Sequence, residues 1–253
     1  MSNLRLQGRK AVVTGASSGI GRAIALAFAA AGCDVVINYR ASVRCAEAVV
    51  EEIRALGCQA FAVRADVGES AEVSELVARA QSHFGVPDIW VNNAGADILT
   101  GEGARADDHT KLRRLLAVDL KGTMECCWAI APLMQAAGHG VILNMSWDLA
   151  LRGLPGRNPQ MFAAVKAGVL GFSRSLARDV APTVRVNVLA PGWIRTAFAD
   201  DAMSGDYYEQ RRQEIPLGRF GAAADVAAAA VFLAGDESAY ITGEVMNING
   251  GLV

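Results

Sequence analysis

Seven short apolar runs recur along this chain of 253 residues, separated by longer segments with helical periodicity. Largely continuous hydrophobicity is typical of strands buried on both faces, as in a parallel sheet, and the segments between them supply right-handed crossovers. We therefore predict an α/β chain with a doubly wound parallel sheet of about seven strands and helices on both faces. The apolar runs are residues 11–13, 34–37, 60–63, 89–91, 141–143, 184–188 and 245–248.

The chain carries no Pro/Gly/Ser-rich linker and no charge run that would divide it, so residues 1–253 are expected to form a single domain. Its composition, 52% hydrophobic and 20% charged with 26 glycines, suits a deeply buried sheet covered by helices. The net charge is −2 and no basic patch with interleaved aromatic residues is present, which argues against nucleic acid as a partner. The expected ligand is a small molecule.

Other classes of protein find little support in the pattern. The five cysteines show no C-x-x-C spacing, so we expect reduced, buried and unreactive thiols. His83, His109 and His139 lack a ligand-like spacing, so no metal site is expected. The first residues lack the apolar core of a signal peptide, and the longest apolar stretch, residues 226–234, is short of the roughly 20 residues that a membrane helix needs. We expect a cytoplasmic protein without a membrane segment.

A glycine-rich turn, residues 14–21, follows the first apolar run and opens a helical segment. The free backbone N–H groups and the positive end of such a helix bind a dinucleotide's pyrophosphate, and glycine lets the backbone approach it closely. The turn therefore predicts a dinucleotide site. The residues expected to contact the cofactor here are Gly15, Ser17, Ser18, Gly19, Ile20 and Gly21.

The second apolar run ends in Tyr39 and Arg40 instead of the Asp or Glu that would bind a ribose 2′-hydroxyl and repel a 2′-phosphate. A guanidinium can pair with a phosphate through two hydrogen bonds. We therefore expect NADP(H) to be preferred, with NAD(H) possible, although Arg40 as a solvated surface residue is an open alternative.

The G-x-x-x-G-x-G spacing of the turn resembles the short-chain dehydrogenase/reductase family, and further motifs follow in that family's order over essentially the whole chain. They are residues 92–95 after the fourth run, the segment around Lys166, residues 191–196 after the sixth run, and residues 241–243 and 249–251 near the end. The resemblance, nearest to 3-oxoacyl carrier-protein reductases, implies a Rossmann fold and an NAD(P)-dependent oxidoreductase.

The same resemblance implies further cofactor contacts. The segment after the third run would contact adenine, although strand-end capping is an equal alternative for Asp66 alone, and Lys166 would hold the nicotinamide ribose. After the sixth run, Ile194 and Thr196 would hold the nicotinamide carboxamide. The complete set implied by the resemblance is Ala65, Asp66, Val67, Asn93, Ala94, Gly95, Lys166, Pro191, Gly192, Ile194 and Thr196.

Phe162 stands one helical turn before Lys166, so both side chains should face the same site. Members of the family have a tyrosine there, a phenol whose pKa of about 10 is lowered by the neighbouring ammonium. A phenyl ring has no proton to give. The family's catalytic asparagine is matched by Asp119, which keeps an acceptor oxygen, adds a charge and favours the ammonium form of Lys166.

The family's N-x-S-S segment resembles residues 144–147, and the simplest alignment puts Trp147 on the catalytic serine. The loop before Phe162 is longer than in the family, so a shift in register would return Ser146 or Asp148 to the site. For Ser146, substrate binding and a hydrogen bond to the backbone at the strand end stay open. Asp148 is either a general acid of raised pKa or a loop aspartate, exposed or paired with Arg152.

A substrate-covering segment is expected at about residues 197–217, where Tyr207 and Tyr208 would either bring in a phenol or pack the cover. Three functions follow from these residues. The first is an NADP(H)-dependent, ketoreductase-like oxidoreductase for a small carbonyl/alcohol substrate with non-standard proton delivery. The alternatives are nicotinamide binding without turnover, and a non-redox dehydratase or isomerase that uses Asp119, Asp148 or Lys166 as base. By resemblance, helices at about residues 108–136 and 158–180 would form a homotetramer or homodimer.

Overall fold

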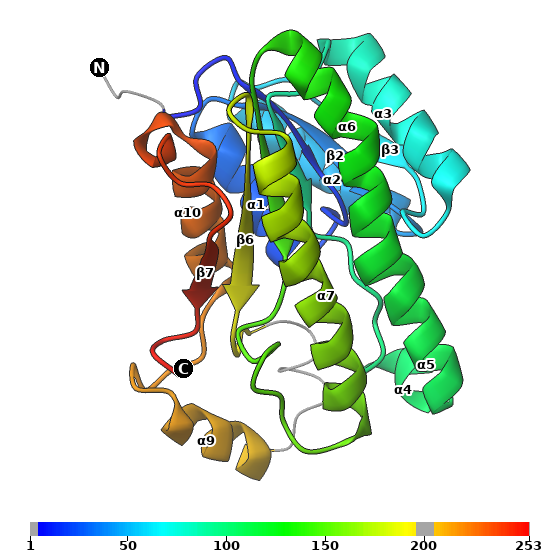
Figure 1. Ribbon diagram of the computed structural model, residues 1–253, viewed down its shortest axis with the longest axis vertical. Helices are drawn as coiled ribbons and strands as arrows, with labels where there is room; N and C mark the ends of the chain where they lie inside the picture. Colours follow the sequence, from blue (N-terminus) through cyan, green and yellow to red (C-terminus); the bar gives the residue numbers. More distant parts are fainter. Residues whose placement is uncertain (1–4, 196–204, 253) are drawn as a thin grey trace.

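The computed structural model describes residues 5–195 and 205–252, which form one parallel sheet with helices packed against it (Figure 1). Seven strands pair in the order β3-β2-β1-β4-β5-β6-β7. This confirms the predicted number, direction and positions of the strands. The strands are β1 (Lys10–Val13), β2 (Asp34–Tyr39), β3 (Ala60–Arg64), β4 (Ile89–Asn92), β5 (Gly140–Met145), β6 (Val184–Pro191) and β7 (Val245–Ile248).

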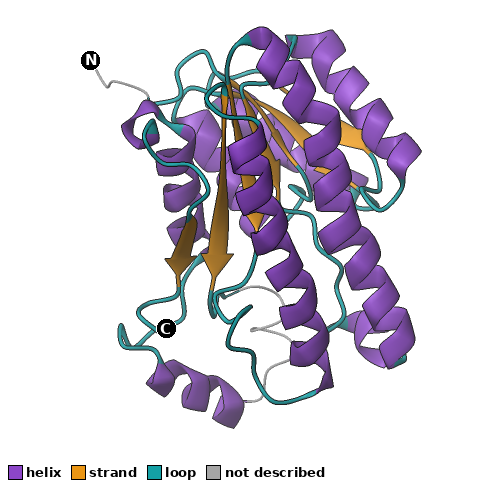
Figure 2. Cartoon of the chain, viewed as in Figure 1, coloured by secondary structure: helices purple, strands orange, loops and turns teal. Residues whose placement is uncertain are grey.

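Helices connect the strands in the alternation that the sequence predicts, and Figure 2 shows them on both sides of the sheet. One departure from regular helix is a π-helical turn, η1 (Leu116–Gly122), between α5 and α6. The helices are α1 (Gly19–Ala30), α2 (Val43–Ala55), α3 (Ser70–Phe84), α4 (Gly101–Arg105), α5 (Asp108–Leu115), α6 (Thr123–Ala137), α7 (Arg157–Asp179), α9 (Gly205–Glu214), α10 (Ala223–Ala234) and the 3₁₀ turn η2 (Asp236–Ser238).

Two hydrophobic cores, one on each face of the sheet, hold the layers together. Helices α1, α2 and α10 pack against one face, and α3, α6 and the end of α7 against the other. Alternate residues of one strand serve both cores, since Ile89 and Val91 face the first while Trp90 faces the second. All three are fully buried. A strand enclosed on both faces explains why the apolar runs are continuous.

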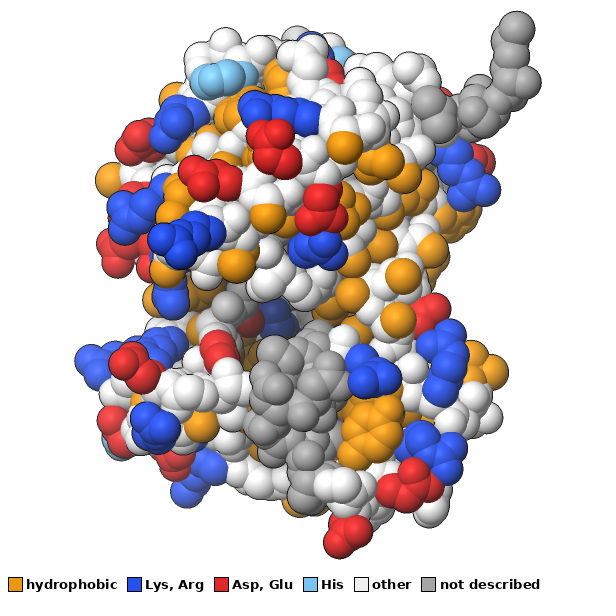
Figure 3. All heavy atoms as spheres, turned by 180° about the vertical axis from the view of Figure 1, so that it is seen from behind, with side chains coloured by type: hydrophobic (Ala, Val, Ile, Leu, Met, Phe, Trp, Pro, Cys, Tyr) orange, Lys and Arg blue, Asp and Glu red, His pale blue; other side chains and the backbone are white. Residues whose placement is uncertain are grey.

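The sheet reverses its order at β1, which pairs with β2 on one side and with β4 on the other. In a doubly wound sheet, such a switch point opens a crevice at the carboxyl ends of the strands, where ligands bind. The strands in Figure 1 end near the middle of the molecule, and the space-filling view in Figure 3 is hollowed at the same level. The fold therefore places the candidate site there.

The cysteines differ in part from the prediction. Cys33, Cys126 and Cys127 are buried and Cys58 is half-buried, but Cys45 is exposed, because it lies outside the buried stripe of α2. Burial raises the pKa of the Cys127 thiol to about 12, so that thiol stays protonated. All five are free thiols.

Residues 5–195 and 205–252 lack two features that other classes of protein carry. None of their helices is both long and apolar enough to cross a membrane. No group of three or more His, Cys, Asp or Glu side chains within that part of the chain is arranged to hold a metal ion.

Candidate active site

The glycine-rich turn crosses closely over the loop after β4. Gly15 has a φ of +62°, and a Cβ added to it would lie 2.8 Å from the Cα of Ala94. A Cβ added to Gly21, in the first turn of α1, would lie 2.5 Å from the carbonyl oxygen of Gly15. Only glycine fits at these positions, because a side chain would strike the neighbouring backbone. This close packing is a second reason for glycine beside the predicted approach to a pyrophosphate.

Thr14 joins the turn to β4. Its Oγ1 accepts hydrogen bonds from the backbone N–H groups of Asn93, at 2.9 Å, and Ala94, at 3.0 Å, and donates to the carbonyl of Val91 at 3.2 Å. The Asn93 amide donates back to the carbonyl of Thr14 at 2.9 Å. The motif at residues 92–95 therefore fixes the loop after β4 to the glycine-rich turn, in addition to lining the site.

Asn38 is a positioning residue that the sequence reasoning missed. It is 1% exposed, its Oδ1 accepts from the N–H of Gly15 at 3.2 Å, and its amide donates to the carbonyls of Val63 and Ala65 at 3.3 and 3.0 Å. One side chain thus ties the turn to β2 and β3. The signal was present in the sequence, because an asparagine inside an apolar strand needs buried hydrogen-bond partners.

A pocket of about 440 Å³ opens at the carboxyl ends of β1 to β4. Most residues predicted for the adenosine half of the cofactor line it, which supports the assignment of that half. The predicted residues in its wall are Gly15, Ser17, Ser18, Tyr39, Arg40, Ala65, Asp66, Val67, Asn93, Ala94 and Gly95, and the additional ones are Asn38, Ala41, Ser42, Asp97 and Val118.

The Arg40 side chain lies at this pocket and is 67% exposed. Its Nη1 is 3.8 Å from an Asp66 carboxylate oxygen, a separation at which an exposed ion pair contributes little. The other Asp66 oxygen accepts from the N–H of Gly68 at 2.9 Å, so Asp66 caps the turn after β3 as well as lining the pocket. The guanidinium is available to an anion at the pocket mouth.

The other predicted cofactor residues lie along the same edge of the sheet. Gly19 and Ile20 begin α1, whose N-cap residue Ser18 makes no side-chain capping bond, so the N–H groups of the first turn face the site without that cap. Gly192 follows β6 and donates to the carbonyl of Ile248 at 3.0 Å, and Ile194 is buried. Thr196 lies outside the described residues.

A buried ion pair occupies the centre of the predicted catalytic site. The Lys166 ammonium lies 2.9 Å from Oδ1 of Asp119, and the two side chains are 6% and 2% exposed. Lys166 also donates to the carbonyl of Met145 at 3.3 Å, and Oδ2 of Asp119 accepts from the N–H of Ala96 at 2.8 Å. Each charge therefore has its counter-charge and a backbone partner, as a buried ion pair requires.

The π-helical turn η1 carries Asp119 in its middle. Such turns widen a helix locally and are frequent at functional sites. The side chain of Thr123 donates to the carbonyl of Asp119 at 2.8 Å, which satisfies one group of the widened turn. The sequence predicted a helix here but carried no sign of its π-helical register.

Two aromatic rings stand beside the ion pair. The ring centroids of Trp147 and Phe162 are 5.4 Å apart in an edge-to-face arrangement, and the Lys166 ammonium lies 5.4 Å from the centroid of Phe162. This confirms that Phe162 and Lys166 share one face of α7. Both rings are only partly buried, so part of their surface borders open space.

Ser146 and Asp148, the two polar residues after β5, have different hydrogen-bond partners. The Ser146 hydroxyl is buried and donates to the carbonyl of Lys166 at 3.0 Å, which matches the backbone-bonded alternative. The Asp148 oxygens accept from the N–H of Leu149 at 2.9 Å and from the amide of Asn249 at 3.2 Å. Burial raises the pKa of the Asp148 carboxyl above its ordinary value, although these hydrogen bonds oppose the shift.

The two tyrosines of the predicted cover lie on α9, below the strand ends in Figure 1. The ring of Tyr207 meets Trp193 edge to face at 6.1 Å, and that of Tyr208 packs on Phe220 at 4.2 Å. These contacts favour the packing alternative over a phenol delivered to the site. The part of the cover at residues 196–204 lies outside the described residues.

The sequence is similar to a family model and to named reductases along nearly its whole length. Residues 15–253 match the family model described as enoyl-(acyl carrier protein) reductase. The chain is 39% identical over 249 residues to the 3-oxoacyl-[acyl-carrier-protein] reductase of Staphylococcus epidermidis, a match that covers 96% of this chain and 98% of the relative. The reductase of the same name from Synechocystis is 39% identical over 252 residues, covering 98% of each chain.

Solved structures of similar chains hold nicotinamide cofactors. A short-chain dehydrogenase of Burkholderia cenocepacia in complex with NADP has a TM-score of 0.88 and 36% identity, and the match covers 98% of this chain and 99% of the other. A 7α-hydroxysteroid dehydrogenase with NADH and 7-oxo glycochenodeoxycholic acid has a TM-score of 0.89 and 33% identity, covering 98% and 96%.

The ion pair can be tested by removing one partner at a time. Lys166→Met leaves the Asp119 carboxylate buried without a counter-charge and is expected to lower the free energy of unfolding by about 3–5 kcal/mol. The double variant Asp119→Asn/Lys166→Met removes that charge and keeps an acceptor for the N–H of Ala96, so it should regain most of the loss. Urea denaturation measures both, and a double variant no more stable than Lys166→Met would contradict the pairing.

Proposed function

This chain belongs to the short-chain dehydrogenase/reductase family, and on that premise we propose that it is an NADP(H)-dependent oxidoreductase for a small carbonyl/alcohol substrate with a proton source other than tyrosine. The observation that carries the proposal is the junction between pocket and ion pair. Gly95 lines the pocket, and a Cβ added to it would lie 3.2 Å from Oδ1 of Asp119. The Gly95 wall of the pocket therefore lies next to the carboxylate that binds Lys166.

The residues of the site fit a nicotinamide dinucleotide. A Cβ added to Gly19 would meet no atom within 4 Å, which leaves room at the start of α1 for a pyrophosphate. Asp66 and Val67 would border the adenine, Lys166 would hold the nicotinamide ribose, and residues 191–195 would border the nicotinamide. When bound, the cofactor supplies the hydride, and the protein supplies binding, orientation and the proton.

Arg40 decides the cofactor preference in this proposal. Structural neighbours of comparable identity hold NADP in one case and NADH in another, so overall similarity does not choose between them. In this chain an exposed guanidinium, and no carboxylate, ends β2 at the adenosine side of the pocket. A 2′-phosphate there would gain a charge-assisted hydrogen bond, which favours NADP(H).

Asp148 is the proposed proton source. It follows Trp147 at the end of β5, its backbone N–H donates to the carbonyl of Pro191 at 3.3 Å, and its Oδ2 lies 2.9 Å from where a Cβ on Gly192 would be. The carboxyl thus lies beside the turn that would border the nicotinamide. Because burial raises its pKa, its neutral form persists to higher pH than that of an exposed aspartate, as a general acid requires.

Nucleotide binding without turnover is the second candidate. Two observations favour it: Asp119 and Lys166 form an ion pair with each other, and the Ser146 hydroxyl donates to the backbone, so these groups already have partners within the protein. The ion pair also disfavours Asp119 and Lys166 as the base of a non-redox dehydratase or isomerase, since the two would have to part first, and it leaves Asp148 as the base open to that alternative. Bound NADP(H) with no turnover of a broad carbonyl and alcohol panel would select binding without turnover.

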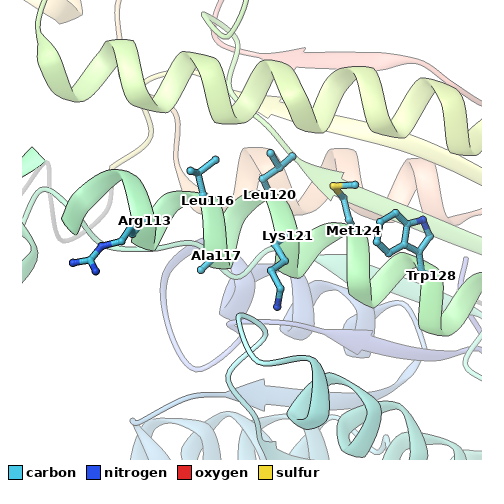
Figure 4. Close-up of a pocket in the computed structure, with 7 residues that line it drawn as sticks. All are labelled: Arg113, Leu116, Ala117, Leu120, Lys121, Met124 and Trp128. Carbon is cyan, nitrogen blue, oxygen red and sulfur yellow. The ribbon is translucent and has the colours of Figure 1, made fainter. Parts of the chain in front are cut away.

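A homotetramer or homodimer is proposed for the assembly, and an apolar groove supports it. The groove, about 440 Å³ in volume, runs along η1 and α6, and Figure 4 shows Leu116, Leu120 and Met124 on the same side of the helix. Leu116 is 42% and Trp128 56% exposed, apolar surface of the kind that contacts between subunits cover. We expect the protein to act in the cytoplasm, where its free thiols remain reduced.

Arg40→Ala tests the cofactor preference. Loss of one charge-assisted hydrogen bond at an exposed site should raise the Kd of NADPH about 10-fold, while the Kd of NADH changes less than about 2-fold. Fluorescence titration measures both constants. Arg79→Ala, which removes an exposed arginine of α3 outside the pocket, serves as control. Equal losses for NADPH and NADH would show that Arg40 does not meet the 2′-phosphate.

Asp148→Asn tests the proton source. With a small ketone that the wild-type protein reduces, the rate should fall by about 10²–10⁴-fold, since an amide cannot act as the acid. The wild-type rate should decline as pH rises through the raised pKa of Asp148, because the carboxyl then ionises. Asp34→Asn, at the amino end of β2, should keep the wild-type rate and pH profile. An Asp148→Asn variant with wild-type turnover would exclude Asp148 as the acid.

The assembly is tested by placing charge in the groove. Leu116→Glu and Trp128→Glu should each lower the molar mass in light scattering, because burying a carboxylate in an apolar contact is unfavourable. Leu56→Glu, on an exposed leucine after α2, should leave the mass unchanged. A wild-type protein that is monomeric at micromolar concentration would refute the proposed assembly.

A further inference from the structure

The centre of the site is formed by groups that have no hydroxyl to give. In the simplest alignment with the family, Trp147 and Phe162 take its serine and tyrosine positions, and in the structure their rings meet while Lys166 and Asp119 bind each other. The neighbouring hydroxyl of Ser146 donates to the carbonyl of Lys166. A carbonyl oxygen placed against these groups would meet aromatic rings in place of two hydroxyl donors.

Charge and aromatic surface at the same place favour a cation. The positive charge of Lys166 is balanced by Asp119 at 2.9 Å, so the pair attracts neither cations nor anions strongly. The Asp148 carboxyl, next in the chain, accepts from the N–H of Leu149 and the amide of Asn249, so it brings no positive charge to the site. Trp147 and Phe162 are both partly exposed, and the face of an aromatic ring carries the negative end of its quadrupole, which attracts cations.

The need for a proton differs between two kinds of hydride acceptor. Hydride addition to a ketone forms a C–H bond and leaves an alkoxide, which must take a proton to become the alcohol. Hydride addition to a protonated imine forms the same C–H bond, and the C=N π electrons become the lone pair of a neutral amine. The two electrons come from the reduced nicotinamide cofactor, which is oxidised, and no proton is taken from the protein.

We propose that the site formed by Trp147, Phe162 and the Asp119–Lys166 pair accepts small protonated imines as a further substrate class and reduces them to amines. This inference rests on the proposed function for the cofactor and the hydride. It assigns the two aromatic residues a role of their own, which is to hold the cationic C=N group. The reaction then needs no phenol at residue 162, because a protonated imine already carries the proton that the amine keeps.

Binding gives the first test, independent of turnover. Pyrrolidine, a cation at neutral pH, and cyclopentanol, a neutral ring of the same size, are titrated into the protein by calorimetry with and without NADP⁺. The cation should bind at least about 10-fold more tightly, because each aromatic face contributes about 2- to 30-fold to the binding of a cation. Equal or weaker binding of pyrrolidine would overturn the proposal.

A pair of variants locates the site. Trp147→Leu should weaken the binding of pyrrolidine about 2- to 30-fold and reduce the preference over cyclopentanol. Phe84→Leu, an aromatic substitution on α3 away from the site, should keep the wild-type preference. An unchanged preference in folded Trp147→Leu would overturn the assignment. Should Trp147→Leu fail to fold, Trp147→Phe, which keeps an aromatic face, should retain the preference, and its loss would count against the proposal.

Turnover separates this inference from the proposed function. Pyrroline, the cyclic imine that yields pyrrolidine, should be reduced faster than cyclopentanone, with the amine identified by mass spectrometry. Its rate should follow the protonated fraction of pyrroline and fall as pH rises through the imine's own pKa. Reduction of cyclopentanone with no preference for pyrroline would leave the proposed function intact and overturn the inference. Failure to bind NADPH would instead refute the proposed function and the reduction of imines with it.

Discussion

The reversal of the parallel sheet at β1 is the constraint on which the rest of the site depends. Because β1 pairs with both β2 and β4, the glycine-rich turn and the loop after β4 must pass each other at one edge. Thr14 holds those loops together through hydrogen bonds to Asn93 and Ala94, and Asn38 ties the turn to the end of β3. The missing Cβ of Gly15 allows the close approach. The pocket lies at that edge, and Gly95, after β4, brings its wall next to the carboxylate of the ion pair.

Beside the pocket, an ion pair and two aromatic rings form the centre of the site. The Asp119 carboxylate neutralises Lys166, and the rings of Trp147 and Phe162 lie next to the pair. The charge of Asp119 and the rings of Trp147 and Phe162 support each other, since a buried ion pair gains strength where water is absent. This combination keeps the cofactor side of the site and alters what the site offers a substrate.

Much of this was accessible from the sequence. The strand positions, the doubly wound arrangement and the shared face of Phe162 and Lys166 follow from local spacing, and the structure has them all. The role of Asn38 was missed, although a polar residue inside an apolar strand signalled it. The exposed Cys45 was predicted wrongly, because a cysteine at the border of an amphipathic helix can face either side.

The sequence by itself determined which elements form, in what order, and that residue 162 has no proton to give, because these depend on periodicity and on residue type. The resemblance already placed Asp119 near Lys166, and the tertiary structure decided that the two form a buried ion pair. Only the tertiary structure decided that the Ser146 hydroxyl donates to the backbone and that Asp148 lies beside Gly192. Those contacts join elements far apart in the chain. Their geometry depends on how η1, β5 and α7 pack, and the spacing of residues along the chain does not encode it.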